Sequence, residues 1–350
     1  MIGTLNGGAG ADVANFAALA TPIQVQLGTT PSVSGLIGRY TAVERMDGNG
    51  LAGGRLVGAN ATTAWVVNAA GDVVVSNVTY SAIPAIAGGT ATDTVTGPAV
   101  ATQWTLNGAN AGSVRVGAVA LAFTGVENLT GSTASDEFIV APTGSLTGNI
   151  NGGTGTGINS VDYSAWSSNI VVNLGVTTAG NATAVSGSMT GIGMVTGGAG
   201  NDSLTGRATL STILIGLGGS DVLIGGSQRD LLIGGTGADI LQGAAGDDLL
   251  ISGTTLHDRD RAALLLIFAE WTSTRTFAQR TANIWGNGVG TRANGTTYLN
   301  NSAADGITDS VFADTETDLL TGGTNQDWFF AAPGEISDLV TAGATPDRRD

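Results

Sequence analysis

Four consecutive units of nine residues run from Gly216 to Ile251, and their spacing decides the fold. They read Gly216-Leu-Gly-Gly-Ser-Asp221-Val-Leu223-Ile, Gly225-Gly-Ser-Gln-Arg-Asp230-Leu-Leu232-Ile, Gly234-Gly-Thr-Gly-Ala-Asp239-Ile-Leu241-Gln and Gly243-Ala-Ala-Gly-Asp-Asp248-Leu-Leu250-Ile. A fifth unit lies upstream at 197–205, and a ten-residue unit without an acid, 206–215, separates it from the other four. The shared register is Gly-Gly-x-Gly-x-Asp-x-apolar-x. A fixed period of this kind indicates a stacked repeat architecture.

Each unit is long enough for a tight turn of six residues followed by a strand of three, so two units close one coil of eighteen. Glycines at positions one, two and four supply backbone conformations that side chains disfavour. Position eight points inward, and one coil cannot bury that side chain alone, so neighbouring coils must stack. We therefore expect an interior ladder of Leu204, Leu223, Leu232, Leu241 and Leu250.

Position six then places one Asp above another along each edge of the stack. Asp202, Asp221 and Asp239 should form one column, and Asp230 and Asp248 the other. Carboxylates about 5 Å apart repel each other unless a cation lies between them. A hard divalent ion held by Asp and turn oxygens at flexible geometry favours Ca²⁺ over Mg²⁺. The alternative is that Asp only caps these turns, as it does in many tight turns without metal.

The same register recurs outside this block. It returns at 304–312, 313–321 and 322–330, which adds Asp309, Asp318 and Asp327, and a single unit at 7–12 adds Asp12. Residues 1–50 and 146–200 look like copies of one module with strands between them. Asp258–Trp271 and 274–285 have the apolar spacing and stop signals of two helices. The predicted segments are 1–196 (degenerate solenoid repeats), 197–251 (the regular repeats), 252–303 (an inserted helical hairpin and loop) and 304–350 (terminal coils and tail).

Composition limits the function classes. The 350 residues include 56 Gly and no Cys, and 28 acidic against 13 basic residues give a formal charge of −15. This charge disfavours nucleic-acid and anionic-membrane partners, and the lack of Cys excludes disulfides and thiolate metal sites. No apolar run is long enough to span a membrane, and the first residues lack the features of a secretory signal. The predicted fold class is all-β, a parallel β-solenoid with an α-helical hairpin near residues 258–285.

The nine-residue register resembles the RTX, or hemolysin-type, calcium-binding repeat, whose units wind into a parallel β-roll. The resemblance is strong over about 55 residues and weak over about 27 more. It implies several structural Ca²⁺ ions held by the Asp carboxylates and by carbonyls of turn glycines. The candidate ligands are Asp202, Asp221, Asp230, Asp239, Asp248, Gly198, Gly200, Gly219, Gly226, Gly235, Gly237 and Gly246, with Asp12, Asp309, Asp318 and Asp327 as further acids.

The resemblance also implies a secreted or cell-surface bacterial protein, exported by a type I system without an N-terminal signal peptide and folded by calcium outside. The implied role is a structural or adhesive scaffold, with calcium and surface polysaccharide or other surface proteins as expected partners, no nucleic acid and no membrane insertion. The alternative class is a module of, or itself, a parallel β-helix carbohydrate-active enzyme.

One pattern needs a cover. Positions seven and nine face outward, yet they are apolar at Val222/Ile224, Leu231/Ile233 and Leu249/Ile251. The inserted hairpin is the predicted lid, and a partner chain is the alternative.

Overall fold

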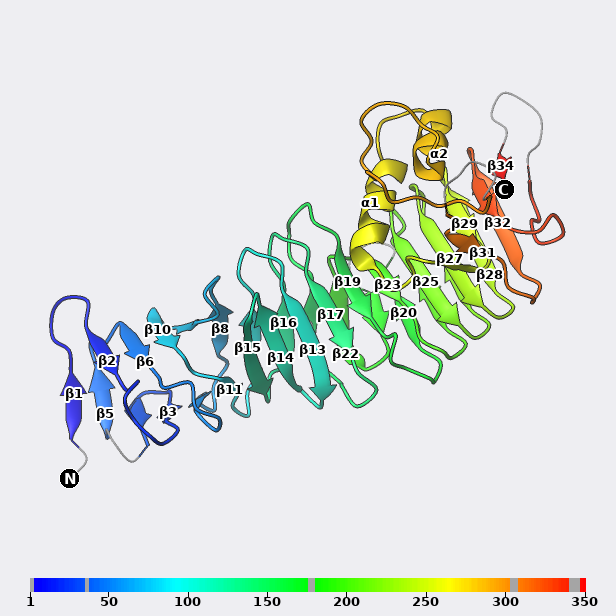
Figure 1. The fold of residues 1–350 in the computed structure, drawn as a ribbon. Coiled ribbons are helices and arrows are strands. Elements are labelled where there is room, and N and C mark those ends of the chain that lie inside the picture. Colours follow the sequence, from blue (N-terminus) through cyan, green and yellow to red (C-terminus); the bar gives the residue numbers. More distant parts are fainter. Residues whose placement is uncertain (1–2, 35–37, 176–179, 303–307, 340–346) are drawn as a thin grey trace. The chain divides into compact units, whose positions relative to one another are not determined.

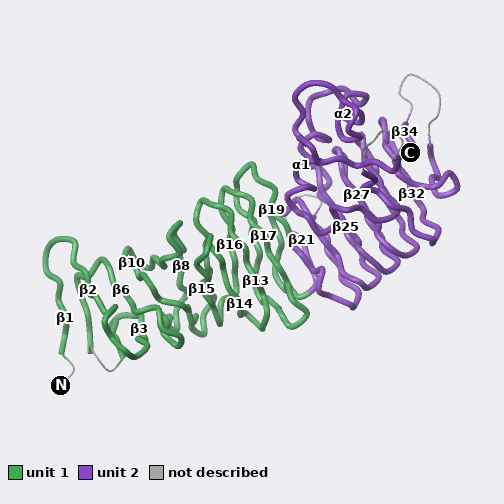
Figure 2. The backbone as a smooth tube through the Cα atoms, viewed as in Figure 1, with its two compact units in different colours: residues 1–160, 184–191 green, residues 161–183, 192–350 purple. Residues whose placement is uncertain are grey.

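The computed structural model describes residues 3–34, 38–175, 180–302, 308–339 and 347–350. Within these residues the chain is nearly all-β and forms two compact units, residues 1–160 with 184–191 and residues 161–183 with 192–350 (Figure 2). The four-segment division expected from the sequence stays a prediction.

The first unit contains two sheets and a separate parallel pair, β1–β5. One sheet has the order β2-β6-β10-β9-β8-β12-β16-β18-β22, and the other β17-β13-β14-β15-β11-β7-β3-β4. Its strands are β1 (Thr4–Asn6), β2 (Val13–Asn15), β3 (Gln24–Gln26), β4 (Ser32–Val33), β5 (Arg39–Thr41), β6 (Arg45–Asp47), β7 (Arg55–Val57), β8 (Ala64–Val67), β9 (Val73–Val75), β10 (Val78–Ser81), β11 (Ala85–Ala87), β12 (Thr94–Thr96), β13 (Gln103–Gly108), β14 (Ala111–Val116), β15 (Val119–Thr124), β16 (Asn128–Thr130), β17 (Glu137–Val140), β18 (Ile150–Asn151) and β22 (Val185–Thr190). β19 (Asn159–Asp162) begins in this unit.

Antiparallel meanders interrupt the parallel pairing expected for this unit. β8, β9 and β10 are joined antiparallel, as are β13, β14 and β15. The turn between β9 and β10 places Ser76 and Asn77 at φ 50° and 65°. Positive φ at both central residues is the geometry of tight hairpin turns, which reverse the chain where a coil would continue.

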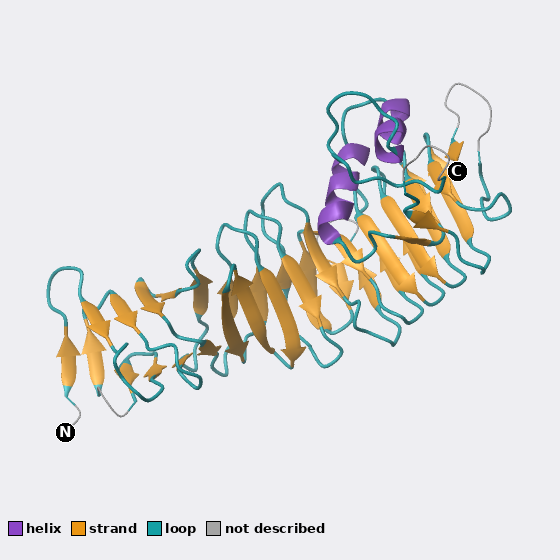
Figure 3. Ribbon diagram, in the orientation of Figure 1, coloured by secondary structure: helices purple, strands orange, loops and turns teal. Residues whose placement is uncertain are grey.

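The second unit is built from two parallel ladders of the predicted repeats (Figures 1 and 3). One sheet has the order β21-β20-β24-β26-β28-β32 and the other β34-β33-β29-β27-β25-β23. Antiparallel pairing in this unit's described strands is found at β20–β21 and β30–β31. The strands are β20 (Val171–Asn173), β21 (Gly180–Ala182), β23 (Ile192–Thr196), β24 (Ser203–Thr205), β25 (Ile213–Gly218), β26 (Val222–Ile224), β27 (Leu231–Thr236), β28 (Ile240–Ala245), β29 (Leu249–Ile251), β30 (Thr254–Thr255), β31 (Val311–Phe312), β32 (Leu319–Thr324), β33 (Trp328–Phe330) and β34 (Arg348–Arg349).

Position eight forms the interior ladder that the sequence predicts. In one sheet Leu204, Leu223 and Leu241 are in register and continue to Leu320. In the other sheet the ladder reads Leu214, Leu232, Leu250 and Phe329. All eight side chains are fully buried.

The inserted segment is a helical hairpin, as predicted. α1 (Arg261–Trp271) begins after Asp260, whose side chain accepts a hydrogen bond from Ala263 N. α2 (Phe277–Trp285) begins with a capping box at Thr276 and ends at Gly286, which adopts a left-handed conformation with φ 110°. Each helix therefore begins and ends where its own sequence satisfies the free backbone groups.

The hairpin covers one face of the second unit. Figures 1 and 3 show the helices beside the sheet that contains β25, β27 and β29. The ring of Trp271 lies 6.0 Å from that of Trp328, and the ring of Trp285 lies 6.0 Å from that of Phe330. Outward positions seven and nine of this sheet are buried, namely Leu231, Ile233, Leu249 and Ile251.

The predicted single apolar face was wrong, because alternate units belong to different sheets. Val222 and Ile224 lie on the opposite sheet, where they are half-buried and where neighbouring Ile240 and Leu319 are 36% and 47% exposed. The hairpin therefore covers only the sheet that carries units 225–233, 243–251 and 322–330.

Residues 304–307 of the predicted unit 304–312 lie outside the described residues, and its described part, 308–312, does not form a strand in phase with the other units. Its strand β31 pairs antiparallel with β30, which leaves it outside both ladders. The two following units do return to the stack, because β32 pairs with β28 and β33 pairs with β29. The prediction for 304–312 was therefore wrong, and those for the next two units are confirmed.

Candidate metal sites in the stacked turns

The position-six residues form two hydrogen-bonded columns in the second unit. In the first column the backbone N–H of each Asp donates to Oδ1 of the next, with N···O distances of 2.6 Å (Asp202 to Asp221), 2.7 Å (Asp221 to Asp239) and 2.7 Å (Asp239 to Asp318). The second column runs in the same way through Thr212, Asp230, Asp248 and Asp327, at 2.6, 2.8 and 2.8 Å. The structure thus places the predicted acids in the predicted columns and joins Asp318 and Asp327 to them across the hairpin insertion.

Several carboxylates in these columns have one oxygen without a partner. Oδ2 is buried and accepts no hydrogen bond in Asp221, Asp239, Asp248 and Asp318, whose side chains are at most 4% exposed. A buried carboxylate oxygen without a hydrogen-bond partner destabilises the folded state by roughly several kcal/mol, because it loses its hydration and gains nothing in return. A cation is the partner that such an oxygen lacks.

The glycine at position one shows where this oxygen points. A Cβ added to Gly216 would collide with Oδ2 of Asp221 and the carbonyl oxygen of Gly234. The same pair of oxygens surrounds Gly234 (Asp239 and Ser252) and Gly243 (Asp248 and Gly322). A carboxylate oxygen and the carbonyl of the neighbouring coil therefore converge on one small space at each of these turns.

The residue at position two explains why Oδ2 is free. Leu217, Gly235 and Ala244 occupy this position before the three orphaned acids of 216–251, and their φ angles are 75°, 113° and 81°. Two of them are not glycine, so they hold a conformation that costs energy for an L-residue. At these turns the N–H of residue two donates no hydrogen bond to the carboxylate of its own unit.

Two acids of the columns are satisfied by the protein. Oδ1 and Oδ2 of Asp202 accept from Ile170 N and Gly198 N at 2.9 and 2.7 Å. Asp230 accepts from Thr212 N and Oγ1 at 2.6 and 2.8 Å, and from Gly226 N at 2.6 Å. Here residue two has no positive φ, and its N–H points at Oδ2.

Burial raises the pKa of every acid in the two columns. Desolvation is the largest cause, and neighbouring carboxylates add to it at Asp221 and Asp248, whose pKa values rise to about 8 and about 9. The pKa is raised to about 7 for Asp239 and Asp327 and to about 6 for Asp230 and Asp318, and it is also raised for Asp202. Near neutral pH the protein alone therefore holds Asp221 and Asp248 poorly as anions, and Asp239 and Asp327 only in part.

The predicted turn glycines serve the backbone in different ways. Gly219, Gly235, Gly237 and Gly246 adopt φ between 102° and 124°, which a side chain would resist. Gly198 and Gly226 donate to their own Asp, and their carbonyls accept backbone N–H from Gly218 and Ala245 at 3.2 and 3.1 Å. A Cβ at Gly200 would collide with the backbone of the neighbouring coil at Ser168 and Asn169.

Two predicted acids lie apart from the columns of the second unit. Asp309 lies outside both columns, because β31, the strand that follows it, pairs with β30 and not with a strand of either ladder. Asp12 belongs to the first unit, where its Oδ2 is buried without a partner and its N–H donates to Glu44 Oε2 at 2.9 Å. Its position-two residue, Gly8, has φ 94°, so this turn shares the geometry of the orphaned turns.

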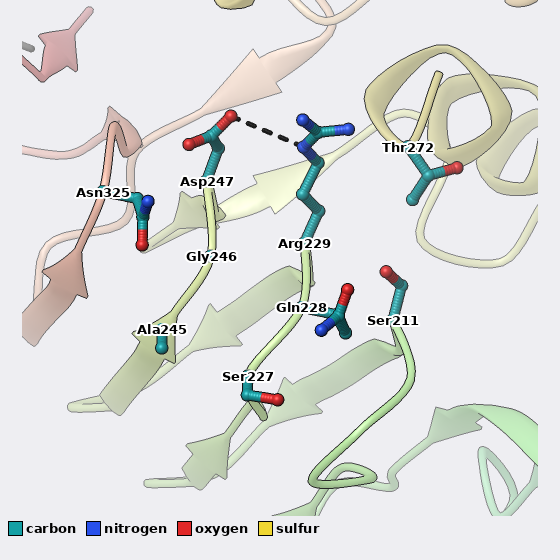
Figure 4. A pocket seen from close by; sticks show the side chains of 9 residues that line it. All are labelled: Ser211, Ser227, Gln228, Arg229, Ala245, Gly246, Asp247, Thr272 and Asn325. Atoms are coloured by element: carbon teal, nitrogen blue, oxygen red, sulfur yellow. Dashed lines mark ion pairs between the residues drawn. The ribbon is translucent and has the colours of Figure 1, made fainter. Parts of the chain in front are cut away.

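A polar cavity of 380 Å³ opens over the turns of the second column, lined by Ser211, Ser227, Gln228, Arg229, Ala245, Gly246, Asp247, Thr272 and Asn325 (Figure 4). Arg229 Nε lies 3.4 Å from Asp247 Oδ2, and Arg280 Nη2 donates to the same carboxylate oxygen. Arg280 is 1% exposed and its guanidinium lies 4.6 Å from the centre of the Trp271 ring. The hairpin is thus fastened to the repeat turns by a buried charge pair.

The donor set favours calcium over transition metals. No group of three or more His, Cys, Asp or Glu side chains gathers among the described residues, so any ion must also take backbone carbonyl oxygens. Mixed carboxylate and carbonyl oxygens suit a hard cation that tolerates irregular coordination, as Ca²⁺ does. Oδ2 of Asp221, Asp239, Asp248 and Asp318, with the carbonyls that face them, fits such an ion.

The fold and the turns define a calcium-binding β-roll module. Residues 190–208 and 214–253 match the family model described as RTX calcium-binding nonapeptide repeat (4 copies). These residues are therefore RTX repeats, as their register predicts. No curated protein matches the chain. None of the described helices is long and apolar enough to cross a membrane.

The sequence analysis missed a second set of position-six residues in the first unit. Asp93 and Asp136 close the segments Gly88-Gly-Thr-Ala-Thr-Asp93 and Gly131-Ser-Thr-Ala-Ser-Asp136, each followed two residues later by a buried apolar side chain. Both Asp side chains are 0% exposed. The signal was the glycine five residues before the acid, which both segments keep; 88–93 also keeps the glycine at position two, and 131–136 has lost it.

Proposed function

We propose that the second unit is a structural module that folds when it binds several calcium ions outside the cell. The observation that carries this proposal is the set of buried Oδ2 atoms without partners. In calcium-poor cytosol the acidic columns repel and the module stays unfolded, which suits export of the chain through a type I system. Extracellular sites bind calcium with dissociation constants of roughly 10⁻⁴–10⁻³ M, so millimolar calcium favours the folded state.

The test is a calcium titration of the whole chain followed by circular dichroism. We expect β signal to grow as calcium reaches the millimolar range and the growth to be reduced in the double variant Asp221→Ala/Asp239→Ala. The matched control is Asp47→Ala/Asp72→Ala, which removes the same charge from two acids that flank the partly exposed Arg45. Full β signal for both units in chelator would refute calcium-coupled folding.

We propose a secreted or cell-surface location and a scaffold or adhesive role for the bacterial protein that contains this module. The polar cavity over the second column supports an adhesive contact with surface polysaccharide, because its hydroxyl, amide and guanidinium groups match sugar hydroxyls. The test compares the parent chain and Gln228→Ala for binding to an array of bacterial polysaccharides. Equal binding by both would count against the cavity.

We also propose that the module is not itself a catalyst. The acids of the columns accept backbone hydrogen bonds from neighbouring coils, which is a structural use of the carboxylate. The alternative, a parallel β-helix carbohydrate-active enzyme or a module of one, predicts turnover of a polysaccharide. An assay for new reducing ends or unsaturated products separates the two.

A further inference from the structure

The first unit contains position-six carboxylates that have no orphaned oxygen. Asp93 accepts from Thr63 N at Oδ1 (2.8 Å) and from Gly89 N at Oδ2 (2.7 Å). Asp136 accepts from Thr102 N and Oγ1 at Oδ1 (2.8 and 2.6 Å). Its Oδ2 accepts from Ser132 N at 2.6 Å. In these two buried carboxylates Oδ2 therefore accepts a backbone N–H, which Oδ2 of the orphaned acids in the second unit does not.

Asn159 continues this ladder with an amide in place of a carboxylate. Its Oδ1 accepts from Asp136 N at 2.7 Å, as each Asp of the second unit accepts from the coil before it. Its Nδ2 donates to the carbonyl of Gly191 at 2.9 Å. The side chain is 3% exposed; the hydrogen bond from Asp136 is buried and the one to Gly191 is partly buried.

The amide nitrogen stands where the orphaned oxygen stands in the second unit. A Cβ added to Gly152, the position-one glycine of this turn, would collide with Asn159 Nδ2 and Gly191 O. At Gly216 the corresponding atoms are Asp221 Oδ2 and Gly234 O. In one turn a donor faces a carbonyl, and in the other two oxygens face each other. Two oxygens also meet at Gly88 (Asp93 Oδ2 and Gly125 O) and at Gly131 (Asp136 Oδ2 and Gly152 O), but there the carboxylate oxygen accepts a backbone N–H.

We infer that the coils of residues 58–160, with 184–191, hold their turns together without calcium, and that the Asn159 amide does there what a calcium ion does between Asp221 and Gly234. This inference rests on the proposed calcium-coupled folding of the second unit. It divides the chain into a part that is folded at any calcium concentration and a part that folds only when calcium is present. Asp12, with its orphaned oxygen, lies outside the inferred calcium-independent coils.

The test is hydrogen–deuterium exchange of the full chain, read by mass spectrometry, in chelator and in millimolar calcium. Amides of 102–140, which include the ladder donors Thr102 and Asp136, should exchange equally slowly in both conditions. Amides of 202–240, which include the donors Asp202, Asp221 and Asp239, should exchange on the order of tenfold faster or more in chelator.

Two variants of Asn159 separate a metal substitute from ordinary packing. Asn159→Asp keeps the size and Oδ1 but replaces the donor with a second oxygen. Exchange near residues 131–160 should become roughly 10- to 100-fold faster in chelator, the effect of one lost buried hydrogen bond, and calcium should restore it. Asn159→Ala should lose protection that calcium does not restore.

The outcomes distinguish this inference from the proposed function. If both units lose protection together in chelator, the inference is overturned and the calcium-coupled folding stands. If neither unit responds to calcium, the proposed function fails. If calcium does not restore Asn159→Asp, the amide does not stand in the place of a metal, and the inference is overturned at its central residue.

Discussion

Replacing Asp248 with Asn should stabilise the calcium-free protein and weaken the calcium-bound one. Oδ1 of Asp248 accepts the N–H of Asp230 at 2.8 Å, and an Asn carbonyl oxygen can accept it equally well. Oδ2 has no partner, and the space beside it is closed by the carbonyl of Gly322. An amide nitrogen at this point would donate to that carbonyl, as Asn159 does to Gly191 in the first unit.

The magnitude follows from the pKa of Asp248, which burial raises from its ordinary value of 3.8 to about 9. Without a cation, folding at pH 7 requires this carboxyl to take up a proton that it lacks in the unfolded chain. Because one pH unit corresponds to about 1.4 kcal/mol, the uptake costs about 4 kcal/mol at pH 7 and almost nothing near pH 4. Asn needs no proton, so Asp248→Asn should gain about 4 kcal/mol at pH 7 in chelator and nothing at pH 4.

The assay is far-UV circular dichroism: the folded fraction without denaturant in chelator at both pH values, and guanidinium unfolding in millimolar calcium at pH 7. With calcium the order should reverse, because the variant has lost a carboxylate ligand. Asp248→Ala is the control, since it removes the same charge but also the acceptor for Asp230. If Asp248→Asn is less stable than the parent chain in chelator at pH 7, the claim that Asp248 Oδ2 lacks a partner without a bound cation is refuted.

In chelator, the free energy of unfolding of residues 197–251 should increase as the pH falls from about 9 towards 4. The raised carboxyl pKa values make the folded state bind more protons than the unfolded state. A free energy of unfolding that decreases on acidification over this range would contradict this prediction. Arg280→Met should destabilise the second unit by about 1–3 kcal/mol, because it removes the buried partner of Asp247 and the hydrogen bond to the carbonyl of Trp271 while Arg229 still pairs with Asp247; the exposed Arg259→Met should change the melting temperature little. Gly234→Ala should abolish one calcium-binding step in titration calorimetry because its Cβ would fill the space between two oxygens, while Gly334→Ala, with nothing within 4 Å of the new atom, should leave the titration unchanged. Equal calorimetric curves for the two glycine variants would exclude that space as part of an ion site.

The regular repeats were predictable because their register depends only on spacing. Counting in nines is enough to align Leu223 with Leu241 and Asp221 with Asp239, since parallel neighbours in a stack repeat every eighteen residues. The same count identified Asp318 as a position-six acid although a long insertion precedes it, but it did not predict its column, which is that of Asp239. It failed for Asp309 because the count takes no account of β30, which pairs with the strand of that unit.

The first unit was harder to predict because its turns have lost most glycines while keeping the ladder. Thr63 and Thr102 occupy ladder positions at which the second unit has acids. The Asn159 amide donates to a carbonyl at a position where, in our proposal, the second unit has a calcium ion. None of these three residues is the Asp that the nine-residue register requires at position six. Thr63 and Thr102 are the sixth residues of turns that begin at Gly58 and Gly97, whereas Asn159 is the eighth residue of the longer turn that begins at Gly152. What they share is a hydrogen bond to the neighbouring coil.

Within residues 197–251, whether a carboxylate oxygen is orphaned or satisfied follows the backbone at position two; the later units depart from this rule, because Asp318 is orphaned although Asp314 has no positive φ. Gly198 and Gly235 have the same letter in the same place, yet only Gly235 has a positive φ, and only its unit leaves the carboxylate oxygen free. Leu217 and Ala244 reach that conformation without being glycine. An Asp at position six is therefore necessary for such a site but does not suffice, since a neighbouring N–H can take the place of the ion. Which of the two occurs depends on how adjacent coils orient one peptide group, and the nine-letter pattern does not record that orientation.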